Sequence, residues 1–168
     1  MAEDQFQWIN QHPPYAYGQW QPPLAIADTT FAKRRVFFEK HPAHCNGKTV
    51  CPACGYPTIN RRRNFDYCGL CHWEDDGQDD PWADQFNGGP NDSSLSEARI
   101  NFATSYCRWS FNDKNDFNAS AQQRLFSERA QQAKRILCEH YNGLMALENK
   151  TAIAQQWQKI EAAIKQLP

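Results

Sequence analysis

The chain has 168 residues and a formal net charge of −1 at pH 7, so it lacks the overall positive charge of most nucleic-acid-binding domains, although this does not exclude a local basic patch. No stretch is long and apolar enough to cross a membrane, and the first 30 residues carry no secretion signal, so we expect a cytoplasmic protein. Six Trp and six Tyr supplement a core that is poor in aliphatic side chains. We expect such a core to need an additional source of stability.

The first 48 residues are rich in proline and aromatic side chains and show little periodicity. Because proline restrains the residue before it to extended conformations, we expect an extended arm over residues 1–48. The rings of Trp8, Tyr15, Tyr17 and Trp20 could bind a partner, or they could lie on the body of the same chain and cover apolar surface. The sequence favours neither interpretation.

Four of the seven cysteines form two Cys-x-x-Cys pairs separated by thirteen residues, namely Cys51, Cys54, Cys68 and Cys71. In a reducing compartment this spacing is typical of a tetrahedral four-thiolate metal site. Zinc is the expected metal, although iron in a rubredoxin-like centre uses the same ligands. Four cysteines leave no open coordination position, so we expect one structural ion that stabilises the fold.

Three cysteines lie outside these pairs. Cys107 and Cys138 fall within helical patterns and are expected to be small buried hydrophobic side chains. Cys45 stands near His41 and His44, where a second metal site is conceivable, but the spacing matches no known ligand pattern.

The predicted fold is α+β. We expect a small zinc-ribbon-like module with short strands at 56–60 and 65–67 that pair across a turn at 60–64. A capping box at Ser94 and Glu97 predicts a helix that runs to about residue 110, and helical patterns begin near residues 118 and 151. The apolar stripes of these three helices should face a common core.

We expect three parts along the chain: the arm over 1–48, the zinc module with the first helix over 49–110, and a C-terminal helical hairpin over 111–168.

Charge is distributed unevenly along the chain. Residues 33–63 hold eight Lys and Arg against one acid, and residues 74–84 hold six acids and no base. The acidic run can be a solvated turn, a second metal site or a negative recognition surface. If it is a recognition surface, its contact residues are Glu74, Asp75, Asp76, Asp79 and Asp80. Some of the bases could neutralise the negative charge of a metal–thiolate centre.

Residues 50–106 resemble the bacterial CPCC-type family of cysteine-rich domains. The resemblance is carried by Cys-Pro-Ala-Cys-Gly-Tyr at 51–56, Cys-Gly-Leu-Cys at 68–71, Trp-Glu-Asp-Asp-Gly at 73–77, Asp-Asp-Pro at 79–81, Gly-Gly-Pro-Asn at 88–91 and Leu-Ser-Glu-Ala-Arg at 95–99. Two positions depart from the family pattern: Ala53 replaces an additional cysteine, and His72 stands where an aromatic residue usually precedes the tryptophan. The resemblance implies a small, non-catalytic zinc-binding module, and members occur among immunity proteins that neutralise secreted toxins.

No catalytic triad, phosphate-binding glycine loop or pair of catalytic carboxylates is recognisable, so we do not expect an enzyme. The leading hypothesis is an immunity protein that binds a cognate protein toxin, with no membrane, nucleic-acid or small-molecule partner. The alternative is a zinc ribbon that binds nucleic acid through the basic tip at Arg61, Arg62 and Arg63. Electron transfer by iron in the same cysteine cage is a third hypothesis.

Overall fold

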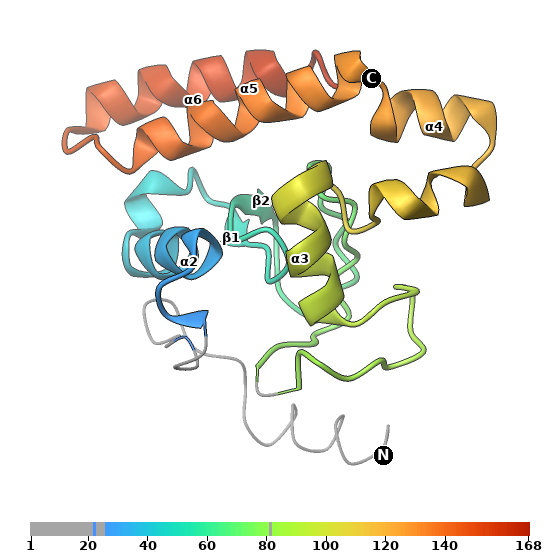
Figure 1. Ribbon diagram of the computed structural model, residues 1–168. Helices are drawn as coiled ribbons and strands as arrows, with labels where there is room; N and C mark the ends of the chain where they lie inside the picture. The colour runs from blue at the N-terminus through green and yellow to red at the C-terminus, as the bar shows by residue number, and fades with distance from the viewer. Residues whose placement is uncertain (1–21, 23–25, 81) are drawn as a thin grey trace.

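The computed structural model describes residues 22, 26–80 and 82–168 (Figure 1). Its elements are, in chain order, α2 (Thr30–Lys40), η2 (Pro42–His44), β1 (Thr49–Val50), β2 (Pro57–Ile59), α3 (Leu95–Ser105), η3 (Phe111–Asp116), α4 (Ala119–Phe126), α5 (Glu128–Leu144) and α6 (Lys150–Ile164). The antiparallel helices α5 and α6 lie side by side over a second layer that contains α2, the two strands and α3 (Figure 1). No helix in the described part of the chain is long and apolar enough to span a membrane.

The expectation of an extended arm up to residue 48 is wrong from Thr30 onwards, because Thr30–Lys40 is the helix α2. The side chain of Thr29 caps the helix by accepting a hydrogen bond from the Ala32 amide at 3.1 Å, and Pro42 follows its end. Prolines are absent from the helix itself, so nothing in this segment interrupts its backbone hydrogen bonds. The arm rings Trp8, Tyr15, Tyr17 and Trp20 lie outside the described residues.

The strand pairing expected between residues 56–60 and 65–67 is also wrong. β2 pairs with β1 in antiparallel fashion, and Tyr67 forms a separate antiparallel bridge with Glu74. Each Cys-x-x-Cys turn reverses the chain, so the segments on either side of one turn are close enough to pair with each other. The structure is thus a mixture of helices and a small two-stranded hairpin, and it does not confirm a zinc-ribbon fold.

The capping box of α3 is confirmed: Glu97 donates its amide hydrogen to Ser94 Oγ, and Ser94 donates its own to the Glu97 carboxylate. The helix ends at Ser105 rather than near residue 110, because Tyr106 adopts a left-handed conformation with φ of 52°. A second capping box at Ser110 then begins η3.

The second predicted helix is divided in two. Ser127 is extended, and its hydroxyl oxygen accepts from the Ala130 amide, so it ends α4 and caps α5. α5 continues through Gly143 to Leu144 without interruption. α6 starts within one residue of its expected position and buries most of its predicted apolar stripe, but Ile164 is 43 % exposed.

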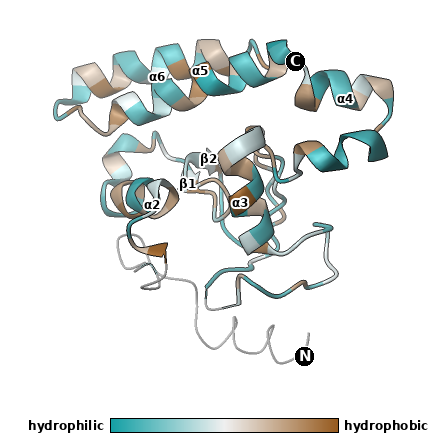
Figure 2. Cartoon of the chain, viewed as in Figure 1, coloured by the Kyte–Doolittle hydropathy of each residue, from teal (hydrophilic) through white to brown (hydrophobic). Residues whose placement is uncertain are grey.

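A single apolar cluster runs through both layers. It contains the four paired cysteines and Trp73 together with Phe38 of α2, Leu95 of α3, Tyr141 of α5 and Trp157 of α6. Apolar residues of the two long helices are visible as brown segments of their ribbons (Figure 2). Cys138 belongs to this cluster and Cys107 to a smaller one beneath α4, so both are buried hydrophobic side chains, as predicted.

Candidate metal centre

Two similar turns, here called the first knuckle (Cys51–Tyr56) and the second knuckle (Cys68–Trp73), carry the paired cysteines. In the first, the Cys51 amide donates to Tyr56 O at 2.9 Å and the Gly55 amide donates to Cys51 O at 2.9 Å. In the second, the amides of Cys68 and His72 donate to Trp73 O and Cys68 O, both at 2.8 Å. The backbone therefore has the same hydrogen-bond pattern in both knuckles.

This pattern requires a left-handed residue directly after the second cysteine of each pair. Gly55 has φ of +77° and His72 has φ of +67°. Glycine adopts this conformation without strain, whereas histidine does so at a cost. The close fit explains why a glycine follows Cys54, because a Cβ atom on Gly55 would lie 3.1 Å from Arg34 Nε.

The four sulfur atoms are placed as a tetrahedral metal site requires. The Sγ atoms of Cys51 and Cys71 lie 3.7 Å apart, those of Cys54 and Cys68 lie 3.8 Å apart, and all four lie within 4.8 Å of one another. Tetrahedral zinc with Zn–S bonds of about 2.3 Å requires S···S separations of about 3.8 Å, whereas a disulfide requires about 2.05 Å. The cysteines are free thiols whose spacing fits a metal ion.

Burial makes two of these thiols poor acids in the absence of a cation. It raises the pKa of Cys51 and Cys71 well above the usual value. Burial also opposes the ionisation of Cys68, but hydrogen bonds from the other three cysteines hold its pKa well below the usual value. A metal ion binds thiolates, so its binding would release protons from Cys51 and Cys71.

All four cysteines are fully buried, so a tetrahedral ion at this site would have no open position for water or substrate. The ligand set suits zinc and also iron. The donor chemistry supports a structural ion that cross-links the two knuckles.

Basic side chains from outside the knuckles hold the knuckle backbone. Arg34 of α2 donates from Nε to Cys54 O at 2.6 Å, and Arg108 donates from Nε to His72 O at 2.9 Å. Lys134 of α5 is buried, and its Nζ donates to Tyr106 O at 3.1 Å and lies 3.0 Å from His72 Nε2. These cations reduce the electrostatic cost of a negatively charged metal–thiolate centre.

His72 is not among the clustered metal ligands. Its Nδ1 contacts the Tyr67 hydroxyl, and burial together with the charge of Lys134 lowers its pKa to about 3. The ring is therefore neutral at pH 7 and links the second knuckle to α5.

The structure does not support a second metal site at Cys45. Within residues 26–80 and 82–168, the four knuckle cysteines are the only group of three or more clustered ligands. His41 and His44 contact the carbonyl oxygens of Phe37 and Leu147 instead. Burial, assisted by Glu39, raises the pKa of Cys45 to about 12.

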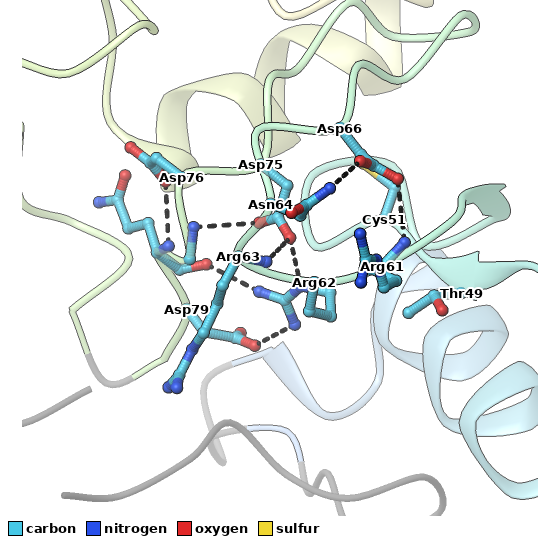
Figure 3. A network of polar contacts seen from close by, with 12 residues as sticks. Thr49, Cys51, Arg61, Arg62, Arg63, Asn64, Asp66, Asp75, Asp76 and Asp79 are labelled. Atoms are coloured by element: carbon cyan, nitrogen blue, oxygen red, sulfur yellow. Dashed lines mark hydrogen bonds and ion pairs between the residues drawn. The ribbon is translucent and has the colours of Figure 1, made fainter. Parts of the chain in front are cut away.

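The acidic run does not form the exposed surface expected from its charge, since Asp75, Asp79 and Asp80 are all buried. Arg62 bridges the carboxylates of Asp75 and Asp79 with two contacts of 2.9 Å (Figure 3). Arg35 also pairs with Asp79, at 2.8 Å. Arg35 and Arg62 of the basic segment therefore neutralise Asp75 and Asp79 of the acidic segment inside the protein.

Two further residues complete this network. Arg99 of α3 pairs with Asp80 at 3.1 Å and donates from Nε to Pro52 O at 3.0 Å, so the network also holds the first knuckle. Burial opposes the ionisation of Asp79, but Arg35, Arg62 and Arg99 outweigh it and hold the Asp79 pKa far below its usual value. Glu74 and Asp76 are only partly buried.

The segment between the knuckles, here called the inter-knuckle loop (60–67), is held by two carboxylates. Asp66 accepts hydrogen bonds from the amides of Asn60 and Arg61, and Asp75 accepts from the Arg63 amide at 2.7 Å (Figure 3). The Phe65 amide donates to Asp75 O, which keeps Phe65 in a left-handed conformation with φ of 55° and its ring 58 % exposed. The sequence hypothesis of a basic tip at Arg61, Arg62 and Arg63 expected aromatic neighbours there for stacking but did not name Phe65 as a contact residue.

The geometry agrees with the comparison with known protein families. Residues 49–113 match the family described as Cysteine-rich CPCC. The match covers 65 of the 168 residues, and over this length the chain is similar to that family. Neither the curated proteins nor the solved structures contain a match to the chain. The matched segment comprises both knuckles, the acidic run and α3, while Arg34, Arg35 and Lys134 contact it from outside.

Proposed function

We propose that the protein is a non-catalytic, zinc-stabilised binding module, and that it acts in the cytoplasm as an immunity protein that occludes the active or target-binding surface of a bacterial toxin. The single observation that carries this proposal is the inter-knuckle loop, whose aromatic side chains are exposed beside a four-cysteine site with no open coordination position. The cysteines leave no coordination position for chemistry, and the loop places large rings in water.

The inter-knuckle loop has the properties of a contact surface. Phe65 and Tyr67 are 58 % and 56 % exposed, and Arg61 beside them is exposed as well. Left-handed backbone at a phenylalanine is energetically costly, and such strain persists where surrounding structure enforces it. Aromatic and arginine side chains are also the residues that contribute most to binding at protein interfaces.

The acidic run supports this surface from within instead of meeting the partner directly. Asp75 fixes the loop through Arg62 and Arg63, and Asp79 anchors Arg62 from the other side. The rings of Trp8, Tyr15, Tyr17 and Trp20 remain a proposed second contact that would raise the affinity through linkage.

Nucleic-acid binding is the second candidate, and one observation favours it: exposed rings next to Arg61 could stack on unpaired bases. Arg62 argues against it, because its guanidinium is occupied by Asp75 and Asp79 and is not available to phosphates.

The test is to co-express the protein with the product of the neighbouring gene and to measure cell survival and the dissociation constant. Truncation of Phe65 and Tyr67 to Ala should weaken binding at least about 30-fold, since rings at the centre of an interface contribute about 2 kcal/mol or more. The matched control is Phe86→Ala, which removes a ring that is 63 % exposed elsewhere.

Equal protection by the double variant and the wild type would refute the contact surface. Binding of a labelled single-stranded RNA that weakens steeply with salt and with the same double substitution would instead establish the second candidate.

A further inference from the structure

A pocket of about 760 Å³ lies between α2, α3 and α5, and none of the four knuckle cysteines belongs to its lining. Four aromatic residues, Phe31, Tyr56, Phe102 and Tyr106, belong to its lining, together with Arg34 and Arg99. Pockets that enclose small organic ligands have volumes of about 300–1,000 Å³ and combine apolar walls with a few polar groups. The size and lining of this pocket fit that class of site.

Arg34 is the unusual member of the lining. Its side chain belongs to a residue that is only 8 % exposed, and its guanidinium carbon lies 4.7 Å from the ring centre of Tyr56 and 5.5 Å from that of Phe102. Nε donates to Cys54 O, but within residues 26–80 and 82–168 neither terminal nitrogen has a hydrogen-bond or ion-pair partner. These two terminal nitrogens can therefore pair with an anion from outside the chain.

The other basic side chains around the pocket already have acidic partners. Arg99 pairs with Asp80, and Arg135 pairs with Glu139 at 2.6 Å. The remaining acid in the lining, Asp84, accepts a hydrogen bond from the Ser96 hydroxyl. Among these groups the positive charge of Arg34 is the one that a ligand would complement.

The aromatic residues of the lining indicate the chemistry of the rest of the ligand, beyond its anionic group. Phe31 lies between two cations, with the guanidinium carbon of Arg34 at 5.6 Å and that of Arg99 at 4.6 Å from its ring centre. The Tyr56 hydroxyl is held by Asn142 at 2.8 Å, which fixes that ring across the pocket. Fixed rings stack well on a flat, apolar ring system.

We infer that this pocket binds a small organic monoanion in which a carboxylate is attached to an apolar ring system. The carboxylate pairs with the terminal nitrogens of Arg34, and the ring system lies against Tyr56, Phe102 and Tyr106. This site is independent of the proposed toxin contact, because the inter-knuckle loop contributes no residue to the pocket lining.

The test uses two probes of the same shape, 2-naphthylacetate and the neutral 2-naphthylacetamide, and isothermal titration calorimetry on the full chain. The acetate should saturate a single site, and the amide should bind at least about tenfold more weakly, because a charge-assisted pair with Arg34 is lost. Arg34→Met should remove that preference, while Arg61→Met, a change at an exposed arginine outside the pocket, should leave it intact.

Arg34 also donates a hydrogen bond to the first knuckle, so a loss of binding in Arg34→Met has two explanations. A second variant therefore tests the pocket without changing Arg34. Ala103 lines the pocket from the exposed face of α3, and Ala103→Trp should fill the space and abolish binding of both probes without touching the Arg34 contacts. Equal affinity for the two probes, absence of saturable binding, or undiminished binding to Ala103→Trp would each overturn the inference.

Discussion

At the scale of single residues, the positions of the charged side chains in the structure differ most from what the sequence suggested. An acidic run next to a basic run suggests two oppositely charged surfaces. In the structure, however, Arg35 and Arg62 pair with Asp79 in the interior. Sequence position gives the sign of a charge and not its partner, because the partners here are separated by up to 44 residues. Buried ion pairs contribute little net stability when intact, yet removing one partner leaves an uncompensated charge.

Asp79→Asn should therefore destabilise the protein by about 3 kcal/mol or more, since Arg35 and Arg62 would remain buried without their shared carboxylate. Urea denaturation followed by tryptophan fluorescence measures the difference. The matched control is Asp116→Asn at an exposed position, which should change the free energy of unfolding by less than about 0.5 kcal/mol.

The lowered pKa of the Asp79 carboxylate also predicts how the stability of the protein depends on pH. The Asp79 pKa is lower in the folded protein than in the unfolded chain, so its stabilisation is complete above about pH 4 and is lost as the pH falls below that value. This loss should be smaller in the Asp79→Asn variant. Parallel pH profiles of the two proteins below pH 4 would contradict the assignment.

At the scale of elements, the cysteine spacing predicted the two turns correctly, and local signals such as the capping box at Ser94 predicted the start of α3. The strand pairing was not predictable in the same way, because residues 57–59 can pair with either neighbouring segment and the choice depends on the reversal at the first knuckle. Similarly, the left-handed Tyr106 ends α3 inside an apolar pattern that continues to Trp109. The helix α2 was missed because its apolar residues show little periodicity.

The two knuckles allow a matched glycine experiment. Gly55→Ala should cost about 1–2 kcal/mol, because Gly55 has a left-handed backbone and a Cβ atom would press on Arg34. Gly69→Ala in the second knuckle should have little effect, since no atom lies within 4 Å of the added carbon. Thermal unfolding of both variants with metal bound provides the comparison, and equal losses would contradict the proposed geometry.

At the scale of the whole molecule, the cysteines and the helices belong to one apolar cluster. Leu137 and Tyr141 of α5 lie in the same cluster as the knuckle cysteines, and Trp157 of α6 donates to His44 O at 2.8 Å. Cys-x-x-Cys spacing and helical periodicity each indicated a part of this arrangement. Neither could indicate that Lys134 from α5 contacts His72 in the second knuckle, because that contact depends on tertiary packing.

The most direct test of the account is the metal content of the purified protein, measured by inductively coupled plasma mass spectrometry against protein concentration. The account predicts one zinc ion per chain in a colourless protein, loss of zinc in Cys51→Ser and Cys71→Ser, and unchanged zinc in Cys107→Ala, because Cys107 is not one of the clustered ligands and packs against Leu125 and Phe126 of α4. A folded protein without metal, or a red protein containing iron, would contradict it.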